Sequence, residues 1–231
     1  MAKKTLILGI GNILWADEGF GVRAVEYLHQ HYQFDDSVKL MDGGTQGLYL
    51  VHHVQEANVL LVFDAIDYGL EPGTLKLIED SDVPKFMGAK KMSLHQTGFQ
   101  EVLAMAEMLG QYPQHLLLVG VQPEQLEDYG GSLREKTRQQ IIPAIQHALD
   151  WLNERGIHAT ERAVPLSVEQ SLSGSEISLE NYEEQRPSED QACRVGDDRV
   201  IKSKEFHIQY RPHSLDPDNQ ISCDVDHRGQ Y

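Results

Sequence analysis

Apolar residues in the first two thirds of the chain follow two patterns that alternate along the sequence. Short, continuous apolar runs are typical of strands buried on both faces, whereas apolar positions spaced as on one helix face separate these runs. The runs predict strands at Thr5–Ile10, Val38–Met41, Asn58–Asp64, Gly73–Ile78 (at a sheet edge) and His115–Gly120. The intervening pattern predicts helices at Gly19–His31, Gly47–Val54, Thr97–Leu109 and Leu133–Asn153.

Local signals predict where the two later helices begin and end. The segments TGFQ at Thr97 and SLRE at Ser132 have the capping-box spacing that opens helices. Pro143 lies inside the last predicted helix, where a missing N–H predicts a kink. Gly156 is expected to end that helix, because glycine readily adopts the left-handed backbone of a C-terminal cap.

This alternation predicts an α/β fold: a three-layer arrangement in which a twisted, mostly parallel five-stranded sheet lies between helices. Ligands of such sheets bind beyond the carboxyl ends of the strands. Candidate functional residues are expected at that edge. Asp17 and Glu18 follow the first strand, Asp42 and Asp64 end the next two buried strands, and His95 lies in a loop before the Thr97 helix.

The composition changes near residue 158. Residues 159–231 carry 8 Lys and Arg against 15 Asp and Glu, and they lack sustained helical or strand periodicity. Such a segment buries too little apolar area to offset the entropy of ordering. We therefore predict an α/β domain at 1–158 and an acidic, largely disordered tail at 159–231, with short strands near Arg199–Ile201 and Phe206–Tyr210.

Charge and composition exclude several function classes. The net charge of −16 disfavours nucleic acid and anionic membrane surfaces, since both need a basic face. The N-terminal MAKKTLILGI breaks into glycines and acids rather than continuing as a signal peptide, and no stretch approaches 18 apolar residues. The two cysteines, Cys193 and Cys223, do not make a disulfide scaffold, so we expect a cytoplasmic protein.

The glycine-rich loop ILGIGNILWADEGFGVR allows three interpretations. Gly9 and Gly11 fit a dinucleotide fingerprint, but Leu14 occupies the third glycine position and the loop has no Gly-Lys-Ser or Gly-Lys-Thr. Each carboxylate near a phosphate would also cost roughly 4 kcal/mol in partly shielded surroundings. A second interpretation, plausible for Asp17, is a solvated acid that favours the dipole of the next helix.

The third interpretation is a metal site formed by Glu18, Asp64 and His95. Two carboxylates and one imidazole suit a divalent ion such as zinc, nickel, cobalt or manganese. Acids at strand ends are also commonly just solvated, so the residues alone leave both interpretations open. Asp42, beside Gly43 and Gly44, is either a supporting acid–base or orienting residue or a turn residue that binds its own backbone.

The order of several sequence blocks resembles the nickel-iron hydrogenase maturation proteases over about residues 4–158. The blocks are GIGNILWADEGFGVR, MDGGTQG, FDAIDYGLEPGT, KKMSLHQTGF, LVGVQPE and LEDYGGSL. Within that family, DAIDYGLEPGT and MSLHQ resemble the subgroup that serves membrane-bound, uptake-type hydrogenases. The resemblance does not extend to residues 159–231.

The resemblance implies an endopeptidase that removes the C-terminal extension of a nickel-iron hydrogenase large-subunit precursor after nickel insertion. Glu18, Asp64 and His95 match the family's metal-binding positions and would recognise the nickel of that substrate, although these ligands suit other divalent ions too. Asp42 is our candidate catalytic residue, in a mechanism that is either metal-linked or of the aspartic type. Family members act mostly as monomers that meet one large subunit.

Two other functions remain open at this stage. A chaperone-like binder could dock on the immature hydrogenase subunit and sense its nickel without cutting it, using the same residues. A nucleotide-binding enzyme is disfavoured by Leu14 and by the acids of the first loop.

Overall fold

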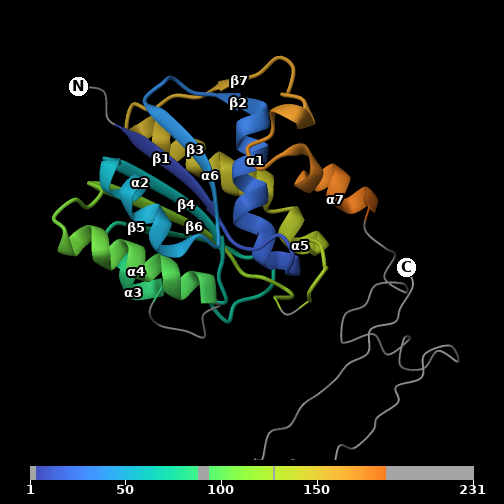
Figure 1. The fold of residues 1–231 in the computed structure, drawn as a ribbon, viewed down its shortest axis with the longest axis horizontal. Coiled ribbons are helices and arrows are strands. Elements are labelled where there is room, and N and C mark those ends of the chain that lie inside the picture. The colour runs from blue at the N-terminus through green and yellow to red at the C-terminus, as the bar shows by residue number, and fades with distance from the viewer. Residues whose placement is uncertain (1–3, 88–93, 127, 186–231) are drawn as a thin grey trace, which may run out of the picture. The chain divides into compact units, whose positions relative to one another are not determined.

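The computed structural model describes residues 4–87, 94–126 and 128–185, and its core is a five-stranded sheet in the order β3-β1-β4-β6-β5 (Figure 1). The strands are β1 (Thr5–Ile10), β3 (Val38–Gly44), β4 (Val59–Ala65), β6 (His115–Val121) and β5 (Leu75–Glu79). The first four are parallel, and β5 pairs antiparallel with β6 at one edge. The predicted α/β class and the edge position of the fourth predicted strand are confirmed.

Helices cover both faces of this sheet. The α-helices are α1 (Phe20–His31), α2 (Val51–Glu56), α3 (Asp82–Met87), α4 (Leu94–Met108), α5 (Glu135–Arg138), α6 (Ile141–Glu154) and α7 (Leu179–Gln185). The 3-10 helices among the described residues are η1 (Ala16–Gly19), η2 (Gly47–Leu50), η3 (Val168–Gln170) and η4 (Ser175–Ile177). No helix in the described ranges has the length and apolar character needed to cross a membrane.

Side chains alternate between the two faces of each strand, which divides the core into two clusters. Ile7 of β1 and Leu61 of β4 pack with the buried faces of α1 and α6. Leu8 and Leu60, their neighbours along the same strands, pack with α2 and α4 on the other face. The sheet is therefore the middle of three layers, as predicted.

Glycines let α1 lie very close to the end of β1. A Cβ atom on Gly9 would lie 2.6 Å from Cγ1 of Val25, and a Cβ atom on Gly21 would lie 2.8 Å from the backbone nitrogen of Ile10. These distances are too short for any side chain, so the two glycines permit the contact between helix and strand. The packing explains Gly9 and Gly21 without a bound phosphate.

Two predicted helix starts were wrong. α4 begins at Leu94, so Thr97 lies inside the helix rather than at its cap. The last predicted helix is two helices, α5 and α6, and Arg134 precedes α5 without a side-chain cap. Pro143 lies in the first turn of α6, and the predicted continuous helix is interrupted at Gln139 and Gln140, where the proline ring would meet the carbonyl of residue i−4. Gly156, with φ of +74°, follows α6 as predicted.

Part of the predicted tail is folded onto the domain. β7 (Thr160–Glu161) pairs antiparallel with β2 (Tyr32–Gln33), and the chain then continues through η3 and η4 to α7. We call residues 159–182 the strap. The boundary at 158 and the disorder of the remaining tail stay predictions. The strands predicted near 199–201 and 206–210, together with Cys193 and Cys223, lie outside the described residues.

Candidate functional site

The first loop and the end of β3 meet through backbone contacts of Gly11. Its N–H donates to the carbonyl oxygen of Gly44 at 3.1 Å, which joins the loop after β1 to the end of β3. Gly11 has φ of +137°, and a Cβ atom there would collide with the carbonyl oxygen of Glu18. Only glycine fits this position, because it combines a positive φ with close backbone packing.

Glu18 and Asp64 lie on neighbouring elements at this edge of the sheet. Glu18 belongs to η1, is half-buried, and donates its N–H to the carbonyl of Trp15 at 2.9 Å. Asp64 lies near the end of the central strand β4, which contacts η1, and it is 0% exposed. The structure thus places both predicted acids at the carboxyl edge, as the strand-end rule requires.

Asp64 influences the ionisation of Tyr68. Burial raises the pKa of the Tyr68 hydroxyl well above its usual value, and the nearby charge of Asp64 raises it further. The Tyr68 ring lies against Gly120, which pairs with Asp64 across β4 and β6. Tyr68 therefore stays protonated beside this buried carboxyl group.

Asp42 makes two different hydrogen bonds. Its Oδ1 accepts the N–H of Gly44 at 2.9 Å, the local bond that a turn residue is expected to make. Its Oδ2 accepts the hydroxyl of Ser173, in the strap, at 2.6 Å. The hydrogen bond expected of a turn residue is therefore present, but the other carboxylate oxygen of Asp42 is held by Ser173, 131 positions away. A catalytic role for Asp42 stays a prediction.

Asp17 is a structural residue that the sequence did not identify. It is 0% exposed, so the prediction of a solvated helix-end acid was wrong. Its Oδ2 accepts the N–H groups of Glu124 and Gln125 at 2.8 and 2.9 Å, and its Oδ1 accepts the N–H of Arg134 at 2.7 Å. Asp17 thus fixes the segment between β6 and α5 against the first loop.

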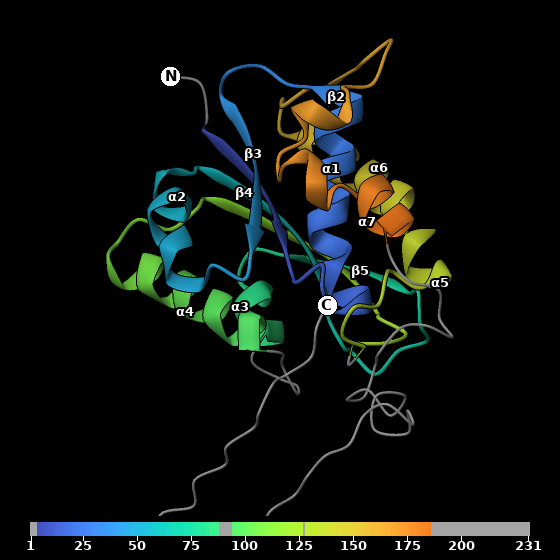
Figure 2. The same cartoon turned by 45° about the vertical axis from the view of Figure 1, so that its right-hand side comes forward.

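His95 lies in the first turn of α4 rather than in the predicted loop, because this helix begins three residues before Thr97. Figures 1 and 2 both show α4 beginning on the side of the sheet where β1 and β3 end. The side chain of His95 is outside the described set. Among the described side chains, no group of three His, Cys, Asp or Glu residues is arranged to hold a metal ion. The metal-site prediction is therefore untested.

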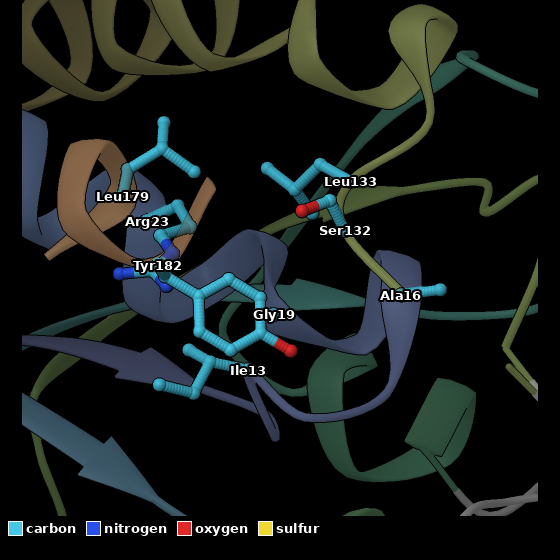
Figure 3. Close-up of a pocket in the computed structure, with 8 residues that line it drawn as sticks. All are labelled: Ile13, Ala16, Gly19, Arg23, Ser132, Leu133, Leu179 and Tyr182. Carbon is cyan, nitrogen blue, oxygen red and sulfur yellow. The ribbon is translucent and has the colours of Figure 1, made fainter. Parts of the chain in front are cut away.

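A small hollow lies beside η1 (Figure 3). Its lining comes from the first loop, α1, the segment before α5, and the strap: Ile13, Ala16, Gly19, Arg23, Ser132, Leu133, Leu179 and Tyr182. Close by, Trp15 packs edge-on against Tyr129, with ring centroids 5.4 Å apart. The strap and the segment before α5 therefore both build walls around the loop that carries Glu18.

Comparison of the sequence and the structure with known proteins relates this chain to one family. A family model described as hydrogenase maturation protease matches residues 22–151. The hydrogenase expression/formation protein HupM of Azotobacter chroococcum is 61% identical over 196 residues, which cover 85% of this chain and 92% of that protein. The hydrogenase 2 maturation protease of Escherichia coli is 40% identical over 160 residues, or 69% of this chain and 96% of that protein.

A solved structure gives the same result. The hydrogenase maturating endopeptidase HybD from E. coli superposes with a TM-score of 0.66 at 39% identity, covering 69% of this chain and 98% of HybD. The sequence similarity and the shared fold agree, and the Hup name is consistent with the predicted uptake-type subgroup. The chain belongs to the hydrogenase maturation protease family.

Proposed function

We propose that this protein removes the C-terminal extension of a nickel-iron hydrogenase large-subunit precursor, and that it does so once nickel has been inserted. Glu18, Asp64 and His95 recognise the nickel carried by that substrate. We further propose that the protein works in the cytoplasm as a monomer that meets one precursor. Family membership supports the precursor as the partner.

The buried carboxyl group of Asp64 carries this proposal. Burying an ionised carboxylate, as at the 0% exposed Asp64, costs free energy unless opposite charges or hydrogen bonds offset it, and a metal ion is one partner that can do so. It lies at the edge where ligands of α/β sheets bind, beside the element that carries Glu18. Two carboxylates and an imidazole form a donor set that suits nickel and similar divalent ions.

The cleavage can proceed by either of two chemical routes. Nickel held in the substrate could polarise the scissile carbonyl or lower the pKa of a bound water, with Glu18, Asp64 and His95 positioning the metal. Alternatively, a carboxylate could act as general base toward the attacking water, and Asp42 is our candidate. Asp42 already has one oxygen fixed by Gly44 and the other by Ser173, so its orientation is defined before substrate binds.

The test is incubation of the purified protein with nickel-loaded and nickel-free precursor, followed by mass spectrometry of the precursor. We expect wild type to shorten the nickel-loaded precursor alone, and Glu18→Gln and His95→Ala to lose this activity. Matched controls are Glu101→Gln and His147→Ala, which change an exposed residue on α4 and on α6. Both controls should cleave like wild type.

Each alternative function predicts a different outcome. Tight binding of the nickel-loaded precursor without any mass change would favour a chaperone-like binder. Cleavage that is indifferent to nickel, with Glu18→Gln as active as wild type, would contradict nickel recognition. Thermal stabilisation by a nucleotide would revive the nucleotide-binding interpretation, which Leu14 and the acids of the first loop disfavour.

A further inference from the structure

The strap follows α1 from its end back to its start. Near the end of the helix, the N–H of Arg162 donates to the carbonyl of His31 at 2.8 Å and the N–H of Leu166 to that of Gln30 at 3.0 Å. At the start of the helix, the Arg23 guanidinium donates to the carbonyl of Ile177 at 2.6 Å. Since α1 begins at the carboxyl edge of the sheet, the strap returns the chain to the candidate site (Figure 2).

A buried ion pair secures the end of the strap nearest the site. Arg23 and Glu26 are each 4% exposed and pair at 2.8 Å. Arg23 also lies 5.7 Å from the centre of the Tyr182 ring, so the strap contacts this pair through Arg23 (Figure 3). Lifting the strap would expose a charged pair and remove a hydrogen bond from a guanidinium group, which makes the strap a fixed part of the domain.

Between these two anchors, Ser173 reaches the Asp42 carboxylate. Its hydroxyl donates to Oδ2 at 2.6 Å, while Leu172 beside it packs against the core cluster that contains α1 and α6. Ser173 therefore lies on a segment that is anchored to α1 before and after it and is packed against the core at Leu172. A hydroxyl held in this way restricts the carboxylate to one orientation.

The strap distinguishes this chain from shorter members of the family. The E. coli hydrogenase 2 maturation protease is aligned over 96% of its length with 160 residues of this chain. The alignment with HupM spans 196 residues, so it is longer than 1–158 and must extend into 159–231. The reaction of the family therefore does not need a strap, whereas this chain and HupM share sequence in that region.

We propose that Ser173 is a positioning residue for the protease reaction and that the strap serves to deliver it to Asp42. The proposal rests on the function proposed above, because it assumes that the Asp42 carboxylate acts during cleavage. In this chain, the hydrogen bond from Ser173 fixes the orientation of the Asp42 carboxylate. Relatives that lack the strap do without this hydrogen bond. The strap is therefore a working part of the site rather than a lid over it.

Steady-state cleavage of nickel-loaded precursor tests the proposal with three variants. Ser173→Ala should lower kcat about tenfold with KM unchanged, the effect of losing one hydrogen bond to a charged acceptor. Ser173→Thr keeps the hydroxyl and should restore most of kcat. Ser171→Ala is the matched control, because Ser171 is on the strap and its hydroxyl makes no hydrogen bond among the described residues. It should cleave like wild type.

A second measurement does not depend on cleavage. The Gly44 amide donates to Oδ1 of Asp42, so loosening this carboxylate should speed the hydrogen exchange of Gly44 in Ser173→Ala but not in Ser171→Ala. Wild-type kcat in Ser173→Ala, or a kcat above wild type, would overturn the proposal. If wild type itself fails to cut, the proposed function fails, and unchanged Gly44 exchange in Ser173→Ala would separately overturn the positioning role.

Discussion

Removing the Asp17 carboxylate is expected to destabilise the whole domain. The carboxylate accepts three backbone N–H groups, two from the turn after β6 and one from Arg134, at 2.7 to 2.9 Å. A hydrogen bond to a charged acceptor contributes about 1.5 kcal/mol at the low end of the measured range, so the three together contribute about 4 to 5 kcal/mol. This is a large share of the roughly 5–15 kcal/mol by which domains are stable.

Urea unfolding followed by far-UV circular dichroism measures this loss. We expect Asp17→Ala to lower the free energy of unfolding by about 4 kcal/mol, because the three N–H donors lose the carboxylate that accepts them. Asp17→Asn keeps one acceptor oxygen but turns an NH2 group toward a donor, so its loss should be about 2 kcal/mol.

The control is Asp36→Ala, which removes an exposed acid and should stay within about 0.5 kcal/mol of wild type. Hydrogen exchange at the amides of Glu124, Gln125 and Arg134 should accelerate in Asp17→Ala alone. A loss below about 1 kcal/mol in Asp17→Ala, with these amides still protected from exchange, would contradict the role of Asp17 in holding the segment between β6 and α5 against the first loop.

Three further changes follow from the geometry. Gly11→Ala places a methyl group against the Glu18 carbonyl at a positive φ, so we expect a loss of about 3 kcal/mol in urea unfolding and of cleavage. Glu26→Gln breaks the buried pair with Arg23 and should cost about 3 kcal/mol, whereas Arg23→Met with Glu26→Leu should recover most of that stability. Burial first, and then nearby acids, raise the pKa of the Tyr112 hydroxyl to about 12. The free energy of unfolding should therefore fall as the pH rises from 10 toward 12, and this fall should be smaller in Tyr112→Phe.

The sheet could be predicted from the sequence because its strands are buried on both faces. Residues such as Leu60 and Leu61 point to opposite sides and still meet apolar partners, which produces a continuous apolar run. Helix starts were less predictable, since Ser132 has the capping-box spacing but is buried by tertiary contacts and precedes no helix directly. A short motif does not reveal which of its polar groups the fold will bury.

The order in the strap could not be predicted from its own composition. Its partners lie on other elements: strand β2, backbone carbonyls at the end of α1, the Arg23 guanidinium at the start of α1, and Asp42 of β3. Periodicity within a segment reports only what that segment can bury by itself. Ser173 reaches Asp42 across 131 positions, so no local pattern contains that contact.

Hydrogen bonding to the backbone distinguishes Asp17 from the adjacent acid Glu18 in the first loop. Asp17 is 0% exposed, and its Oδ2 already accepts two N–H groups while its Oδ1 accepts a third. A carboxylate whose two oxygens already accept three N–H groups has little capacity left for a metal ion. Glu18, the next residue along η1, is half-buried and thus reachable from solvent. These hydrogen bonds give Asp17 a structural role, and this argument favours Glu18 over Asp17 as the candidate metal ligand independently of the family resemblance.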